Sequence, residues 1–196
     1  MPTSRSAARG PARREALLDD LVDLVLAEGF AGTTLDELAG RLHCSKTTLY
    51  AVAASKEQLV VTAVRRFFAR ATVAVEERAA AAPDHRARIE AYLLAVSEQL
   101  QPASAAFFAD LAGFAPAAEV YAQNTATAAR RVQELVTDGI GAGAFRPVHA
   151  SFVGAAVASV MAAIHAGRVG AATGLDDAAA YRELAALVVA GLQPGR

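Results

Sequence analysis

Cysteine is almost absent from this 196-residue chain, since Cys44 is the only one. A single cysteine excludes an intramolecular disulfide and favours a reducing compartment, so we expect a cytoplasmic protein. Net charge is also nearly absent, at −1, and by itself it indicates no class of partner. The N-terminus has arginines but no apolar run before residue 16, which argues against a secretory signal.

Charge is missing altogether from one long stretch, residues 147–167, which has no Asp, Glu, Lys or Arg. Its length would allow a membrane crossing. However, it consists mostly of Ala, Gly, Ser and Val, so we expect a helix buried inside the protein and no membrane partner. Sustained alternation of apolar and polar residues is missing too, and little or no sheet is expected.

Helix-forming residues dominate the chain, and proline and glycine punctuate it. Thr34 and Glu37 have the spacing of a capping box, Ser45 is expected to cap the next helix, and Ser55 with Gln58 the one after it. The pattern predicts an all-α protein of about nine helices, near residues 11–28, 34–42, 45–50, 55–81, 84–100, 104–111, 117–140, 150–166 and 177–192.

Two short predicted helices joined by a tight turn, after a longer helix, are typical of a helix-turn-helix DNA-binding domain. The second short helix begins with small or cationic hydrogen-bond donors, which suit the major groove, and its neighbours can hold phosphates. Residues 1–10 are basic and are predicted to form a flexible arm. The predicted DNA contacts are Thr33, Thr34, Arg41, Ser45, Lys46, Thr47, Thr48, Tyr50 and Lys56.

One part of the chain, from about Leu17 to Leu59, resembles the TetR-family signature. The matching runs are Gly29-Phe30-x-x-Thr33-Thr34-Leu35-x-x-Leu38-Ala39, Ser45-Lys46-x-Thr48-Leu49-Tyr50 and Ser55-Lys56-Glu57-x-Leu59. Farther on, Gly143-x-Phe145-Arg146-Pro147 is similar to that family's turn before its last two helices.

The resemblance implies a transcriptional regulator, a repressor, that binds double-stranded DNA as a homodimer at a near-palindromic operator. It also implies release from DNA by a small-molecule effector. Residues 1–54 would then form the helix-turn-helix DNA-binding domain. Residues 55–196 would form the helical ligand-binding and dimerisation domain.

Three positions depart from the usual pattern of that family. His43 stands at the turn position that is usually glycine, where a left-handed backbone disfavours most residues but histidine less than many. Cys44 stands where valine is usual and is small and apolar enough to pack there. Ala53 replaces an aromatic residue.

Aromatic residues cluster in the predicted middle helices. Core packing is their default role, but bulky rings in an alanine-rich core can also line a cavity. Few charges fall in this region, so a largely apolar ligand is expected; for His165 the alternative is a core histidine with satisfied hydrogen bonds. The candidate ligand contacts are Tyr92, Phe107, Phe108, Phe114, Tyr121, Asn124, Met161 and His165.

The last two predicted helices, near 150–166 and 177–192, are apolar on more than one face. Two copies of this helix pair would form a four-helix interface with two-fold symmetry. The predicted interface residues are Phe152, Val153, Val157, Val160, Ile164, Leu184, Leu187 and Val188.

Other classes of function have little support in the sequence. No acid–base pair, nucleophile arrangement or metal-ligand spacing stands out, so we expect no enzyme, no metal and no cofactor. The alternative to a DNA-binding regulator is a helical ligand-binding or interaction protein without DNA-binding activity, which His43 and Ala53 leave open.

Overall fold

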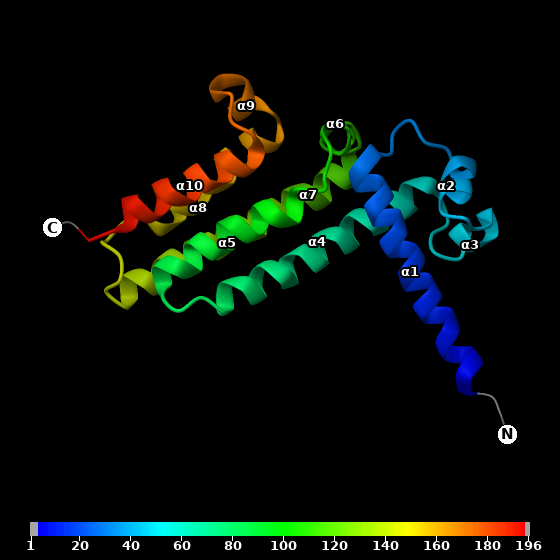
Figure 1. Ribbon diagram of the computed structural model, residues 1–196, viewed down its shortest axis with the longest axis horizontal. Coiled ribbons are helices and arrows are strands. Elements are labelled where there is room, and N and C mark those ends of the chain that lie inside the picture. Colours follow the sequence, from blue (N-terminus) through cyan, green and yellow to red (C-terminus); the bar gives the residue numbers. More distant parts are fainter. Residues whose placement is uncertain (1–3, 195–196) are drawn as a thin grey trace. The chain divides into compact units, whose positions relative to one another are not determined.

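The computed structural model describes residues 4–194, with side chains from Arg13 onward, and it confirms the all-α prediction, because every regular element in that range is a helix (Figure 1). The helices are α1 (Ser4–Glu28), α2 (Leu35–Arg41), α3 (Lys46–Tyr50), α4 (Lys56–Ala80), α5 (His85–Leu100), α6 (Ala105–Gly113), α7 (Ala115–Gly141), α8 (Ala150–His165), α9 (Arg168–Thr173) and α10 (Asp177–Leu192).

Helix starts follow the predicted caps. The Thr34 hydroxyl accepts a hydrogen bond from the Glu37 N–H at 3.2 Å, and the Glu37 carboxylate accepts one from the Thr34 N–H at 2.7 Å, which completes the capping box. The Ser55 hydroxyl accepts from the Gln58 N–H at 3.2 Å. The Gln58 side chain, however, accepts from Ala54 and not from Ser55 itself. Local side-chain chemistry therefore sets where α2 and α4 begin.

The main differences from the prediction are two helix starts and one additional helix. Helix α1 begins at Ser4 and not at Pro11; of the predicted N-terminal arm, residues 1–3 and the side chains up to residue 12 lie outside the described residues. Helix α7 includes Pro116 in its first turn, where a missing N–H costs nothing. The short helix α9 was not predicted. It lies between Gly167 and Gly174, which both have left-handed backbones.

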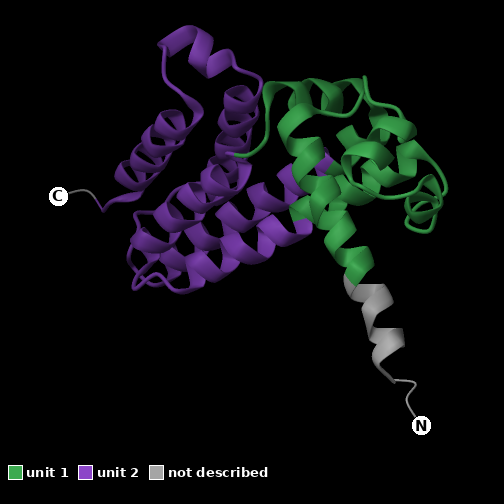
Figure 2. Ribbon diagram, turned by 45° about the vertical axis from the view of Figure 1, so that its right-hand side comes forward, with its two compact units in different colours: residues 1–68, 102–120 green, residues 69–101, 121–196 purple. Residues whose placement is uncertain are grey.

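The chain forms two compact units. Unit 1, green in Figure 2, comprises residues 1–68 and 102–120, so it combines α1–α3 and the start of α4 with α6. Its buried residues include Leu21, Leu49 and Phe107, each at most 1 % exposed. The Ser104 N–H donates to the Leu26 carbonyl at 2.8 Å, which joins the start of α6 to the end of α1.

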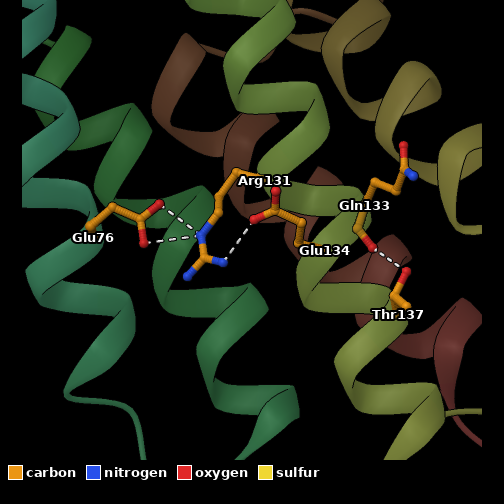
Figure 3. A network of polar contacts seen from close by, with 5 residues as sticks. All are labelled: Glu76, Arg131, Gln133, Glu134 and Thr137. Carbon is orange, nitrogen blue, oxygen red and sulfur yellow. Dashed lines mark hydrogen bonds and ion pairs between the residues drawn. The ribbon is translucent and has the colours of Figure 1, made fainter.

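Unit 2, purple in Figure 2, comprises residues 69–101 and 121–196. Helix α10 packs against α5 and α8, and the core includes Leu93, Val136 and Tyr181. Figure 3 shows Arg131 of α7 between two carboxylates: its Nε lies 2.8 Å from Glu76 of α4, and its Nη1 lies 3.1 Å from Glu134. The Glu76 pair joins the C-terminal half of α4 to α7 within this unit.

The predicted turn after α7 closes the end of unit 2. Gly143 has a left-handed backbone, and the Phe145 ring is buried. The Arg146 N–H donates to the carbonyl of Leu192 at 3.0 Å, and its guanidinium donates to the carbonyl of Gly191 at 2.6 Å. A cation at the C-terminus of a helix also complements the helix dipole, so this turn holds the end of α10 in place.

Candidate nucleic-acid interface

Helices α2 and α3 pack against each other and leave α3 with one buried position. Leu38 of α2 and Leu49 of α3 are 2 % and 1 % exposed. The Ser45 hydroxyl caps α3 by accepting the Thr48 N–H at 3.1 Å. The other polar residues of α3 remain accessible: Lys46 and Thr47 are exposed and Thr48 is half-buried. The result is a short helix with a polar outer surface, fixed to its neighbour by leucine packing.

The turn between α2 and α3 has an identifiable backbone geometry. Helix α2 ends at Arg41, Leu42 is its C-cap, and His43 follows with φ of 48°. The Cys44 N–H donates to the Ala39 carbonyl at 2.9 Å, and the His43 N–H donates to the Gly40 carbonyl at 3.2 Å. These two bonds define a Schellman motif, in which the left-handed residue is usually glycine. The left-handed backbone predicted at His43 is therefore present.

The predicted cations of this region all have partners within the chain. Lys46 Nζ lies 2.6 Å from a carboxylate oxygen of Asp36. Arg41 forms a two-pronged ion pair with Glu28, and the pKa of the Glu28 carboxyl is held below its usual value mainly by that hydrogen bond. Lys56 Nζ donates to the carbonyl of Ala31 at 3.2 Å. Asp36 was not among the predicted residues, because no motif marks it as a partner of Lys46.

The remaining predicted DNA contacts lie around the start of α2 and the end of α3. Thr34 is exposed, although its hydroxyl and N–H are used in the capping box. Thr33 is half-buried. Tyr50 is 51 % exposed, so its ring is not a core residue of the described unit.

Cys44 and Ala53 are both half-buried. Burial raises the pKa of the Cys44 thiol, which opposes thiolate formation and supports the predicted packing role. Arg14 of α1 donates from Nη2 to the carbonyl of Val52 at 3.2 Å. This bond joins α1 to the segment after α3, one residue before Ala53.

The predicted ligand contacts fall into both units. Phe107, Phe108 and Phe114 belong to unit 1, where Phe107 is fully buried and contacts the rings of Phe30 and Phe67 edge-on, with centroids 6.5 and 6.3 Å apart. The other five belong to unit 2: Tyr92 and Met161 are buried, and Tyr121, Asn124 and His165 are half-buried.

His165 is held by two tyrosines in unit 2. Its Nδ1 lies 2.9 Å from the Tyr121 hydroxyl and its Nε2 lies 2.8 Å from the Tyr181 hydroxyl. Burial lowers the pKa of His165 to about 4, so the ring is neutral at pH 7. Burial also raises the pKa of the Tyr181 hydroxyl. The sequence singled out His165 and Tyr121, whereas Tyr181 was not predicted because nothing local links it to a residue 16 positions away.

The predicted dimer residues divide by burial. Val157, Ile164 and Leu184 are 2 %, 1 % and 7 % exposed, so they pack inside unit 2 and offer a partner no surface. Phe152 and Leu187 are 71 % and 70 % exposed, and Val160 is exposed as well. A groove of about 360 Å³ on this part of α8 and α10 includes Phe152, Val153, Leu187 and Val188 in its lining.

The described helices include none with the length and apolar character that a membrane span needs. Among the described residues, no three His, Cys, Asp or Glu side chains are grouped so as to hold a metal ion.

Comparison with known proteins gives one match to a family of sequences. Residues 17–63 match the sequence model for bacterial regulatory proteins of the tetR family. No curated protein matches the chain.

Solved structures resemble the chain over almost its whole length. A transcriptional regulator from Saccharomonospora viridis, solved in complex with choline, is 13 % identical with a TM-score of 0.78, covering 94 % of this chain and 100 % of that one. A TetR-family regulator from Cytophaga hutchinsonii is 15 % identical with a TM-score of 0.73 and full coverage of both chains.

A third similar structure is the TetR-family regulator PfmR from Thermus thermophilus. It is 18 % identical with a TM-score of 0.64, covering 91 % of this chain and 99 % of that one. At such low identities the structural similarity establishes the fold alone, and the sequence match concerns residues 17–63 alone. Residues 17–63 thus match the N-terminal domain of the tetR family, and the chain as a whole has the same fold as these solved regulators.

Proposed function

We propose that the protein regulates transcription by inserting α3 into the major groove of DNA. The observation that carries the proposal is the capped, polar and exposed surface of α3, fixed by Leu49, within a domain that matches the tetR family. Lys46, Thr47 and Thr48 would contact base edges, and Thr34, Tyr50 and Lys56 would contact phosphates. Residues 1–54 would provide DNA binding, and residues 55–196 ligand binding and dimerisation.

The ion pairs around α3 are compatible with DNA binding. Lys46 and Asp36 have side chains that are 49 % and 73 % exposed, and Arg41 and Glu28 are 48 % and 47 % exposed. Exposed pairs of this kind contribute little to stability, because water screens both charges. A DNA phosphate can therefore replace the carboxylate at little cost, and the pairs hold the cations near the surface until DNA arrives.

We further propose a homodimer formed through α8 and α10. Isolated exposed apolar residues are ordinary, but Phe152 and Leu187 line one groove together with Val153 and Val188. A two-fold related copy would bury the same surface on both chains. Two recognition helices would then enter successive major grooves, and the operator would be a near-palindrome.

Sedimentation analysis at micromolar concentration tests the dimer. Leu187→Asp should convert the dimer to a monomer, because it places a charge in the apolar interface. Leu175→Asp is the matched control, since Leu175 is an exposed leucine outside α8 and α10. A wild-type monomer, or a Leu187→Asp protein that stays dimeric, would contradict the proposed interface.

The regulatory step that we propose is release of DNA on binding of a small, largely apolar ligand, as expected of a repressor. The candidate contacts are the unit 2 residues Tyr92, Tyr121, Asn124, Met161 and His165, where the polar groups around His165 carry no net charge at pH 7. The regulator from Saccharomonospora viridis was solved with choline, which supports a small-molecule site in this fold.

Helix α4 would couple ligand binding to DNA release, because it is continuous from Lys56 to Ala80 and has residues in both units. A ligand that favours one state of the protein shifts the population toward it, and DNA affinity falls if that state fits the operator poorly. A thermal-shift screen tests the ligand class. Stabilisation by polyanionic metabolites alone would contradict a largely apolar ligand.

Fluorescence anisotropy with labelled DNA from the region upstream of the protein's own gene tests the DNA-binding proposal. At fixed salt, Lys46→Ala with Thr47→Ala should weaken binding by about tenfold or more, as loss of base contacts predicts. Thr127→Ala with Arg130→Ala is the control, because it removes an exposed threonine and a neighbouring cation from α7. Equal losses in both double variants, or no loss in either, would favour the alternative of an interaction protein without DNA-binding activity.

A further inference from the structure

A pocket of about 300 Å³ lies within unit 1, apart from the ligand contacts proposed above in unit 2. Its lining comes from the loop between α1 and α2, from the first turns of α4, and from α6 with the residue after it. Of its lining residues, only Lys56 has a role in the functions proposed above, as a phosphate contact. Its volume is at the lower end of the range for small-molecule sites, which suits a compact ligand.

The apolar part of the pocket is built from aromatic and aliphatic side chains that have firm support. Phe30 and Val60 are 5 % and 1 % exposed, and Phe114 is half-buried. The Phe30 and Phe114 rings meet edge-on with centroids 6.0 Å apart, and Phe30 also contacts Phe107. Rings packed in this way on both sides change position little, so the apolar wall exists before any ligand binds.

The polar part of the pocket is fixed by bonds to the loop between α1 and α2. Asp110 of α6 accepts hydrogen bonds from the N–H groups of Phe30 and Ala31 through the same oxygen, at 2.5 and 2.8 Å. Lys56 Nζ donates to the Ala31 carbonyl. Gly29 permits this approach, because a Cβ there would lie only 2.5 Å from Asp110 Oδ2. The Asp110 carboxylate is therefore held at the pocket by a preformed backbone cradle.

The charges that line the pocket favour a cation. Asp110 and Glu57 are acidic, whereas Lys56 is the one basic residue among the described lining residues and already donates to a carbonyl. Hydrogen bonds from its own N–H and from Ser55 keep the pKa of Glu57 below the usual value, so the Glu57 carboxyl is negative at pH 7. An anionic ligand would meet two carboxylates and an aromatic wall, whereas an ammonium group is attracted by both.

We propose that this pocket binds a compact organic cation, with its apolar body against Phe30 and Phe114 and its ammonium group at Asp110. Such a ligand contacts the loop that leads into α2 and the first turn of α4. It therefore acts directly on the DNA-binding unit and needs no ligand in unit 2. This site is additional to the proposed effector site, and either one can fail without the other.

Three probes that share one ring and differ in charge test the chemistry: benzylammonium, benzyl alcohol and benzoate. Their binding is followed by chemical-shift changes of the backbone amides of Ala31 and Phe114 in the full-length protein. Benzylammonium should bind with a Kd of about 1 mM or tighter, and about tenfold more tightly than benzoate. Equal or tighter binding of benzoate, or no shift at either amide at roughly tenfold higher benzylammonium, would overturn the proposal.

Two variants locate the site. Gly113→Leu should abolish binding of all three probes, because Gly113 lines the pocket and a Cβ there meets no other atom within 4 Å, so the added side chain enters open space. Gly141→Leu is the control, because Gly141 is the last residue of α7 and a Cβ there also meets no atom within 4 Å. This variant should leave binding of the probes unchanged.

Asp110→Asn keeps an acceptor for the loop but removes the charge. It should weaken benzylammonium binding about fivefold or more and leave benzyl alcohol binding unchanged. Unchanged benzylammonium affinity in Asp110→Asn or in Gly113→Leu would overturn the assignment, and the benzyl alcohol control shows that the pocket remains folded.

Discussion

Replacement of His43 offers the sharpest test of the turn that positions α3. His43 holds a φ of 48° at the C′ position of the Schellman motif that ends α2. Its side chain is exposed and has no hydrogen bond or ion pair among the described residues. The left-handed backbone is therefore held by the two turn hydrogen bonds and by the packing of α2 on α3, with no help from the imidazole.

The expected magnitudes follow from backbone energies. A left-handed conformation costs an L-residue roughly 1–2 kcal/mol, and histidine is among the more tolerant residues. Glycine removes that cost but adds about 0.5–1 kcal/mol of entropy to the unfolded chain. His43→Gly should therefore stabilise the protein by about 0.5 kcal/mol, or roughly 1–2 °C in Tm. His43→Val should destabilise it by about 2 kcal/mol, because a β-branched residue at positive φ is a true outlier.

Denaturant unfolding followed by circular dichroism measures the stability of the variants, which should decrease in the order Gly, Asn, His and Val at position 43. Asn is included because it tolerates a left-handed backbone and carries no ring. DNA affinity of the Gly variant should stay within about twofold of wild type, since the turn geometry is unchanged. A stable Val variant, or a Gly variant less stable than wild type by more than about 1 kcal/mol, would refute the argument that backbone strain resides at this turn.

Three further predictions concern charge, packing and pH. Asp36→Asn should tighten DNA binding about two- to fivefold, because it releases Lys46 and removes a carboxylate near the duplex. Gly154→Ala should destabilise the protein by about 1–3 kcal/mol, because the added Cβ would clash with the Ala129 carbonyl of α7. Burial lowers the pKa of His165 to about 4, so the folded protein resists protonation of this ring and its free energy of unfolding falls as the pH falls from about 6.5 toward 4. His165→Gln should remove this pH dependence of the free energy of unfolding, which amounts to up to about 3 kcal/mol.

Each of these predictions has a matched comparison. For Asp36→Asn, the gain should shrink as salt is raised, and a gain independent of salt would contradict an electrostatic cause. For Gly154→Ala, the control is Gly191→Ala on α10, where a Cβ meets nothing within 4 Å. For His165, unfolding free energy is measured between about pH 4 and 8, and identical profiles for wild type and His165→Gln would show that another group is responsible.

The helix starts and the α2–turn–α3 arrangement could be predicted from the sequence, because the interactions that set them are local. Thr34 and Glu37 are three residues apart, and so are Ser45 and Thr48, and each pair closes a bond that the spacing alone predicts. The left-handed backbone at His43 was implied by the resemblance, in which this turn position is usually glycine. Helix α9 was missed because the glycines on both sides of it indicate a loop when only the residue pattern is considered.

The sequence by itself determined the all-α class, the helix-turn-helix and the capped, polar α3, since a helix and its caps depend on residues within about four positions of each other. Only the tertiary structure decided which apolar residues are surface and which are core. Phe152 and Val157 lie five residues apart on α8, yet one is exposed and the other is buried. It also brought Asp110 to the Phe30 and Ala31 N–H groups, across some 80 positions of sequence. Burial and long-range pairing depend on which helices pack together, and no local pattern encodes that choice.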